Sequence, residues 1–217
     1  MLEVSQLDCV RGERTLFSGL ALRLDAGEAL HLQGQNGSGK TSLLRILSGL
    51  SLPAAGEVRW SGQGIGKLGE DYRRKICYLG HLNALKDDFT PAENLINSAR
   101  LADQALDDES AREALTRIGL TERENLPCRY LSQGQKRRVA LARLVGEKRA
   151  LWLLDEPYVA LDPTAVSTVA DLIDLHLQGG GLVVFTTHQP VTLKTKHLRE
   201  ILLTPSPFSP LSQSVSC

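Results

Sequence analysis

The sequence predicts an α/β fold in which helices cover a parallel sheet. Two apolar runs, at 150–154 and 182–185, contain no alternating polar residues, which is typical of parallel strands buried on both faces. Segments with apolar residues at helical spacing separate the predicted strands, for example 43–50 and 166–173. A glycine-rich stretch at 34–39 joins a predicted strand to a predicted helix, at the edge where open α/β sheets bind ligands.

The remaining elements fit around this core. Residues 1–32 predict short strands, because leucine alternates with polar or small residues at 20–24. The region from about 85 to 147 carries almost only helical patterns, with strands expected on both sides of it. We therefore expect one domain at 1–203 with a helical subdomain inserted at about 85–147. The Pro- and Ser-rich tail, 204–217, is expected to be disordered.

Composition excludes several classes of protein. The 217 residues carry 25 basic and 25 acidic side chains, so the formal net charge is zero, which argues against a general nucleic-acid or membrane-surface binder. No apolar run approaches the roughly 18 residues that cross a bilayer, and the N-terminus shows no signal-peptide pattern. The cysteines have no zinc-ligand spacing and are expected to be buried and reduced. They are Cys9, Cys77, Cys128 and Cys217.

Residues 34–41 fit the GxxxxGK[ST] pattern of a phosphate-binding loop. Glycines let the backbone wrap an anion closely, and the N-terminus of the following helix directs its unpaired N–H groups at that anion. Lys40 would reach the β- and γ-phosphates, and the Thr41 hydroxyl would bind Mg²⁺. An ordinary glycine-rich turn is the alternative. The predicted nucleotide contacts in this segment are Gly34, Gln35, Asn36, Gly37, Ser38, Gly39, Lys40, Thr41 and Ser42.

Two adjacent carboxylates, Asp155 and Glu156, follow the apolar run at 150–154. A nearby cation would offset the repulsion between two neighbouring negative charges. We expect Asp155 to hold Mg²⁺ through water and Glu156 to act as the general base that polarises a water molecule. The alternative is a solvated strand end without a catalytic role.

A second candidate anion site lies at Leu131-Ser-Gln-Gly-Gln135. Ser132 and Gln135 have the spacing of a capping box, which alone explains their presence at the start of a helix. A capped helix N-terminus beside a glycine, Gly134, also suits an anion. The sequence leaves both interpretations open.

These motifs, with Ala160-Leu-Asp162 and Thr187-His188, resemble the ATP-binding cassette (ABC) family in order and spacing, up to about Leu203. The resemblance implies a P-loop NTPase fold whose ABC-type nucleotide-binding domain has an N-terminal antiparallel β region and an inserted helical subdomain. It also implies ATP hydrolysis with Mg²⁺, in a head-to-tail dimer with two ATP molecules in the interface. Because the sequence has no internal repeat, this chain would supply half of that dimer.

The resemblance also implies roles for individual residues. Ser132 and Gly134 of one copy, with Gln135 beside them, would face the γ-phosphate on the loop of the other copy. His188 would contact that γ-phosphate, and Asp162 would couple the two sites across the interface. Two alternatives stay open, because Asp162 is also a good helix N-cap before a proline and a histidine at a strand end is often structural.

Two positions depart from the family pattern. Arg11 stands where an aromatic residue usually stacks on adenine, and a guanidinium can also stack on a flat ring, so Arg11 is our hypothesis for an adenine contact. A solvated surface arginine is the alternative. His81 replaces the glutamine that normally touches Mg²⁺ or the lytic water. Histidine could orient water, but activity would then depend more on pH.

Within the family, the chain resembles the ATP-binding subunits of cytochrome c maturation systems. The resemblance rests on residues 11–19, on Gly80-His81 and on Thr187-His-Gln-Pro190. It implies integral membrane subunits as partners, at the inner face of the bacterial plasma membrane, and ATP hydrolysis that drives haem export or release of a haem-loaded chaperone. No CxxCH motif is present, so we expect no direct haem binding.

Three other functions compete with this one. The chain could energise an ABC transporter for another cargo, such as a lipid or drug. A soluble ABC protein acting on ribosomes or DNA usually has two cassettes, and zero net charge also disfavours nucleic acid. A purely regulatory ATP-binding module is disfavoured because Glu156 and His188 are both present.

Overall fold

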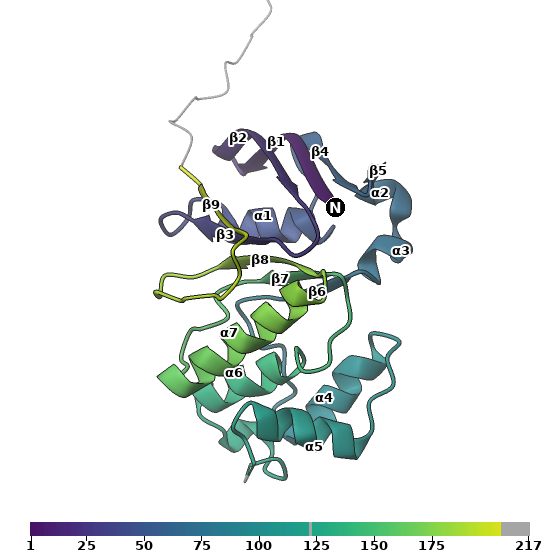
Figure 1. Cartoon of the computed structure of the whole chain (residues 1–217), viewed down its shortest axis with the longest axis vertical. Helices are drawn as coiled ribbons and strands as arrows, with labels where there is room; N and C mark the ends of the chain where they lie inside the picture. Colours follow the sequence, from purple (N-terminus) through teal and green to yellow (C-terminus); the bar gives the residue numbers. More distant parts are fainter. Residues whose placement is uncertain (122, 205–217) are drawn as a thin grey trace, which may run out of the picture.

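The computed structural model describes residues 1–121 and 123–204. The predicted disorder of the tail at 204–217 lies, from residue 205 onward, outside the described residues. The described chain forms two sheets and a group of helices at the end far from the N-terminal strands (Figure 1). No helix in this part of the chain has the length and hydropathy needed to cross a membrane.

The first sheet is antiparallel and lies at one end of the molecule. In spatial order its strands are β2 (Arg14–Leu24), β1 (Leu2–Arg11), β4 (Ala55–Trp60) and β5 (Gln63–Gly64). Its buried side chains, such as Leu2 and Val4 of β1, alternate with more exposed ones, as in a sheet with one solvated face. The N-terminal antiparallel β region implied by the family resemblance is therefore confirmed.

The second sheet is parallel and forms the centre of the molecule. In spatial order its strands are β6 (Ile76–Leu79), β7 (Leu151–Leu154), β8 (Leu182–Thr186), β3 (Ala29–Gln33) and β9 (Leu198–Leu202). Every residue of β7 and β8 is buried, which confirms the interpretation of the two apolar runs. Leu151 and Leu153 pack toward the antiparallel sheet, whereas Trp152 and Leu154 pack toward the helices on the other face.

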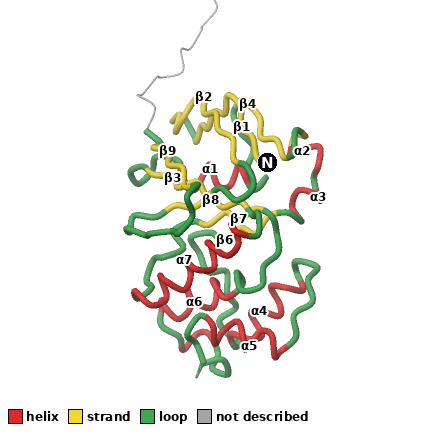
Figure 2. The backbone as a smooth tube through the Cα atoms, viewed as in Figure 1, coloured by secondary structure: helices red, strands yellow, loops and turns green. Residues whose placement is uncertain are grey.

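Helices cover both faces of the parallel sheet (Figure 2). Helix α1 (Lys40–Leu47) lies between the two sheets and packs on both through Leu43, Leu44 and Leu47. Helix α7 (Pro163–Gln178) packs on the opposite face of the parallel sheet. It begins at the N-cap Asp162.

The segment between the neighbouring strands β6 and β7 is largely helical. It contains α4 (Pro91–Arg100), α5 (Asp108–Arg117), the short 3-10 turn η1 (Cys128–Tyr130) and α6 (Gln133–Ala142). The three α-helices contact one another, and loops join them. Thr90 begins α4 with a capping box, in which the Glu93 N–H donates to Thr90 Oγ1 at 3.2 Å.

Some elements differ from the sequence-based expectation. Strands β4, β5 and β9 and the short helices α2 (Ile65–Leu68) and α3 (Glu70–Arg73) were not anticipated. Helix α1 ends at Leu47, so Leu50 lies outside it and is 57% exposed, although its spacing fits the helical pattern. Three cysteines are buried and free, as expected, and Cys217 lies outside the described residues. They are Cys9, Cys77 and Cys128.

Candidate active site

The glycine-rich loop connects the end of β3 to the start of α1, and its geometry excludes larger residues. Gly34 has a left-handed φ of 146°, and a Cβ there would lie 2.5 Å from Ser38 Oγ and 2.6 Å from the Leu203 carbonyl. A Cβ on Gly39, whose φ is 103°, would lie 3.0 Å from the Phe17 ring. Glycine at these two positions therefore leaves the loop backbone free of side chains, so that a ligand can approach it closely.

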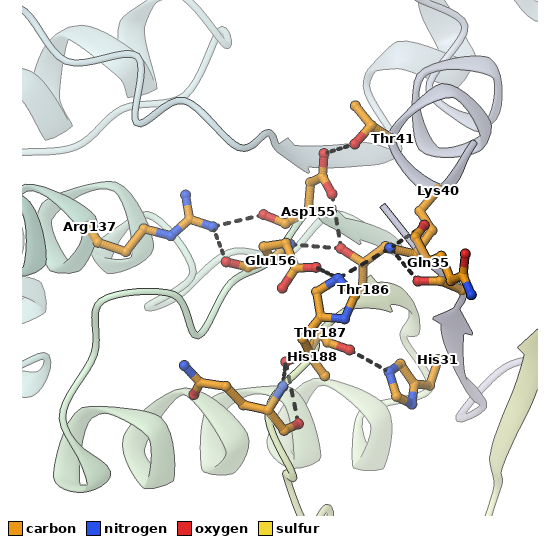
Figure 3. Close-up of polar contacts among 12 residues, drawn as sticks. His31, Gln35, Lys40, Thr41, Arg137, Asp155, Glu156, Thr186, Thr187 and His188 are labelled. Carbon is orange, nitrogen blue, oxygen red and sulfur yellow. Dashed lines mark hydrogen bonds and ion pairs between the residues drawn. The ribbon is translucent and has the colours of Figure 1, made fainter. Parts of the chain in front are cut away.

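Lys40, the first residue of α1, directs its ammonium into this loop. Nζ donates to the carbonyls of Gly34 and Gln35, at 2.7 and 3.3 Å, and lies 3.3 Å from Nε2 of His188 (Figure 3). The residue is 8% exposed, so its positive charge is concentrated at the site. Ser38 Oγ is also buried and has no hydrogen-bond partner among the described residues. A bound anion would satisfy both side chains.

Asp155 follows the last residue of β7 and lies beside Thr41 on α1. Thr41 Oγ1 donates to Asp155 Oδ2 at 2.7 Å, and Thr186 Oγ1, at the end of β8, donates to Asp155 Oδ1 at 2.9 Å. Asp155 is 2% exposed. The structure therefore brings together the two residues proposed for Mg²⁺, with the carboxylate fixed by two hydroxyls.

Glu156 adopts a left-handed backbone conformation, with a φ of 49°. This conformation costs a non-glycine residue about 1 kcal/mol or more, so the surrounding contacts must hold it. Its N–H donates to Thr186 Oγ1 at 2.8 Å, and its carbonyl accepts from an Arg137 Nη at 2.8 Å. The carboxylate Oε1 lies 3.4 Å from His188 Nε2. The backbone turn thus directs the carboxylate toward His188.

Arg137, on α6, is only 5% exposed, and the sequence analysis did not assign it a role. Burial lowers the pKa of its guanidinium, and the nearby carboxylates of Asp155 and Glu156 oppose that effect. All five of its N–H groups have acceptors. These acceptors are Asn83 Oδ1 and the carbonyls of Gly80, Asp155, Glu156 and Pro157, at 3.2, 3.1, 2.9, 2.8 and 3.4 Å.

His31, on β3, supports the segment that carries His188, although the sequence analysis assigned it no role. Its ring stacks on Phe185 with centroids 4.9 Å apart and an angle of 4°. Nε2 lies 3.2 Å from the Thr187 carbonyl, while Nδ1 lies 3.3 Å from both Gln33 Nε2 and Glu200 Oε1. The ring therefore helps to fix the backbone just before His188.

Lys40, Thr41, Asp155, Glu156 and His188 line one cavity of about 670 Å³ at the carboxyl ends of β7 and β8. The cavity also includes Arg11, at the end of β1, and His81, in the loop after β6. The cavity thus contains most of the loop, the acidic pair, His188 and both departures from the family pattern. Three predicted loop contacts do not line it, namely Gly34, Gln35 and Ser38. Whether Arg11 contacts adenine and whether His81 orients water stay predictions.

A second hollow, of about 630 Å³, contains the other predicted contacts and shares no lining residue with the first. Ser132 begins α6 with a capping box, because the Gln135 N–H donates to Ser132 Oγ at 3.2 Å and the Ser132 N–H donates to Gln135 Oε1 at 2.9 Å. Asp162 caps α7 and pairs with Arg138. Both structural interpretations from the sequence are therefore confirmed, and they leave the anion roles open.

Comparison with known proteins identifies the family. The family model described as "ABC transporter" matches residues 17–159. The cytochrome c biogenesis ATP-binding export protein CcmA of Dechloromonas aromatica is 59% identical over 203 residues, which cover 94% of this chain and 100% of that protein. The chain belongs to the CcmA family of ABC ATPases. The CcmA of Escherichia coli O157:H7 is 45% identical over 204 residues, covering 94% and 97% of the two chains.

Solved structures agree with the fold of this CcmA-family chain. A putative ABC transporter ATP-binding protein from Pyrococcus furiosus superposes with a TM-score of 0.78 at 24% identity, covering 92% of this chain and 96% of that one, and shows the fold alone. The ATP-binding cassette MJ0796, solved as a post-hydrolysis dimer bound to ADP and phosphate, superposes with a TM-score of 0.77 at 27% identity. That match covers 87% of this chain and 88% of the other.

The residues of this CcmA-family chain suit a magnesium–nucleotide complex. Thr41 and Asp155 already touch, so one hydroxyl and one carboxylate face the cavity together. Among residues 1–121 and 123–204, no group of three or more His, Cys, Asp or Glu side chains could hold a metal ion. A site with few protein ligands fits Mg²⁺, which keeps water and phosphate oxygens in its coordination shell.

Proposed function

We propose that this chain, an ABC ATPase of the CcmA type, hydrolyses ATP at the cavity around Lys40 and energises haem export, or release of a haem-loaded chaperone, in cytochrome c maturation. One observation carries the catalytic part. His188 Nε2 lies 3.3 Å from Lys40 Nζ and 3.4 Å from Glu156 Oε1, in the cavity that the Thr41–Asp155 pair also lines. A γ-phosphate held by the loop would meet all of them.

The proposed chemistry is an in-line displacement at the γ-phosphorus. The loop N–H groups and Lys40 bind the β- and γ-phosphates, and Thr41 and Asp155 hold Mg²⁺, which neutralises charge on the phosphate oxygens when bound. A water oxygen attacks the γ-phosphorus while Glu156 accepts the water's proton, and the bond to ADP breaks. His188 would contact a γ-phosphate oxygen and stabilise its developing charge.

The second hollow supports a dimer in this proposal. Part of its lining is the N-terminus of α6, whose free N–H groups suit a phosphate, and none of its residues lines the first cavity. Ser132, Gly134 and Gln135 would therefore face the nucleotide of a second copy, and Asp162 would lie at the interface. ABC cassettes do form dimers, as in the solved MJ0796 structure.

The partner and the location follow from the family in this proposal. The chain would work at the inner face of the bacterial plasma membrane, attached through the integral membrane subunits of the maturation complex. Direct haem binding is not expected, because the sequence has no CxxCH motif. Nucleic acid is not an expected partner, because the net charge is zero. In the same proposal Arg11 stacks on adenine and His81 orients the attacking water.

Glu156→Gln tests the catalytic assignment. The variant should bind ATP normally and lose at least about a hundredfold in hydrolysis rate, because the general base is gone but the shape is kept. Glu113→Gln, on the exposed face of α5, is the matched control and should turn over at the wild-type rate. Wild-type turnover in Glu156→Gln would exclude Glu156 as the base.

Affinity purification from native membranes tests the biological role. We expect cytochrome c maturation subunits to co-purify with the chain. Subunits of a transporter for another cargo would contradict the proposed role but leave the ATPase assignment intact. Ribosomal proteins would contradict membrane transport altogether.

A further inference from the structure

Arg137 links three segments of the chain, and every N–H group of its guanidinium donates a hydrogen bond. One segment is α6 itself, which carries Arg137. The second is the loop after β6, where Gly80 and Asn83 accept hydrogen bonds from one Nη. The third is the turn after β7, where the other Nη binds the carbonyls of Asp155 and Glu156 (Figure 3). Nε completes the set by donating to the next carbonyl of the same turn.

The contact with Glu156 matters because the backbone of that residue is strained. Its φ of 49° lies in the left-handed region, so the peptide needs support on both sides. Thr186 Oγ1 accepts from the Glu156 N–H, and Arg137 donates to the Glu156 carbonyl. Arg137 therefore holds the turn that directs the general base, without touching the carboxylate that performs the chemistry.

Helix α6 connects these hydrogen bonds of Arg137 to the second hollow. Gly134 lines that hollow, and Arg137 lies one helical turn further along the same helix. A shift of the α6 N-terminus would move the guanidinium and both loops that it binds. The loop after β6 includes His81, so the same shift would also reach a residue that lines the first cavity.

We propose that Arg137 is a positioning residue that couples the two ATP sites of the dimer, by transmitting the position of the α6 N-terminus to the turn of Glu156 in the same copy. The inference rests on the proposed ATP-bound dimer, in which the α6 N-terminus of one copy touches the nucleotide of the other. ATP bound at one site would then align the general base of the other site, through the single helical turn between Gly134 and Arg137.

Arginine is needed for this role because of its shape. Its planar fork presents five donors in fixed directions, whereas an ammonium has three donors at one point and cannot reach both loops together. Lysine keeps the positive charge near Asp155 and Glu156, so Arg137→Lys removes the geometry of the link but not its charge. Arg117→Lys, on exposed α5, is the matched control.

The test measures nucleotide affinity, turnover and cooperativity on the full chain. We expect Arg137→Lys to bind a fluorescent ATP analogue within about twofold of the wild-type affinity, to lose about tenfold or more in kcat, and to change its Hill coefficient from about 2 to about 1. Arg117→Lys should match the wild type in all three. A residue with a merely structural role is not expected to keep its ATP affinity while turnover and cooperativity fall.

Several results would overturn the inference. One is a folded Arg137→Lys with wild-type kcat and Hill coefficient; another is a uniform loss of affinity and turnover together. If wild-type chain itself fails to hydrolyse ATP, the proposed function fails instead. Should Arg137→Lys not fold, Asn83→Ala decides, because it removes one acceptor of the guanidinium outside the first cavity. Asn83→Ala should lower the Hill coefficient, and an unchanged Hill coefficient would contradict the link.

Discussion

Thr186→Val should destabilise the protein by about 2–6 kcal/mol, because Asp155 Oδ1 and the Glu156 N–H each lose a hydrogen-bond partner at a cost of about 1–3 kcal/mol. Thr186 is fully buried, and its Oγ1 donates to Asp155 Oδ1 at 2.9 Å while accepting from the Glu156 N–H at 2.8 Å. Valine keeps the shape of the side chain but has no hydroxyl. The carboxylate would keep its bond from Thr41, whereas the strained Glu156 peptide would lose its support on the N–H side.

Urea unfolding measures this change directly, and ATP turnover should fall with it because the turn carrying Glu156 loosens. Thr168→Val is the matched control, since the Thr168 hydroxyl bonds only the Thr164 carbonyl on the exposed side of α7. It should change stability by no more than about 0.5 kcal/mol. A loss below about 1 kcal/mol in Thr186→Val would refute the claim that this hydroxyl holds the acidic pair.

Two further predictions concern stability away from the cavity. Gly56→Ala should lower the free energy of unfolding in urea by about 2–4 kcal/mol more than Gly62→Ala does. Both residues have a φ of 81°, but only at Gly56 would a Cβ meet the Gln6 carbonyl, at 2.1 Å. Equal losses of stability in the two variants would contradict this clash. Burial raises the pKa of Cys77 from 9.0 to about 12, which favours the neutral thiol in the folded state. The stability of wild type relative to Cys77→Ala should therefore be constant below pH 9.0 and fall between pH 9.0 and about 12, by about 1.4 kcal/mol per pH unit. A difference independent of pH would contradict this burial.

The sequence predicted the parts of the fold and site whose signal is local. The run that became β7 is fully buried on both faces, so it shows no alternation, and the phosphate loop is contiguous from Gly34 to Thr41. By contrast, β4 buries only Val58 and β9 buries none of its residues, so neither shows an apolar period that a sequence pattern could reveal. Neither strand could have been placed without knowing its neighbours in the sheet.

The supporting residues of the site were missed because their partners are distant in sequence. Thr186 meets Asp155 across 31 positions, and Arg137 meets Gly80 across 57. One local signal pointed to Arg137, because it lies three and four residues before the buried Ala140 and Leu141 and so shares their face of α6. A charged residue on a buried helical face needs acceptors, and this pattern alone could have marked it.

The central claim, that each ATP site is completed by a second copy, is tested most directly by complementation between two inactive variants. Lys40→Met removes the phosphate-binding ammonium, while Ser132→Asp keeps the cap of α6 but directs a negative charge at the partner's γ-phosphate. A mixed dimer would have one site with an intact loop and an intact α6 N-terminus. The mixture should therefore hydrolyse ATP faster than the sum of the two variants measured alone, although the lost coupling from the second site should keep it about tenfold below the wild type. A mixture as inactive as its components would contradict the account.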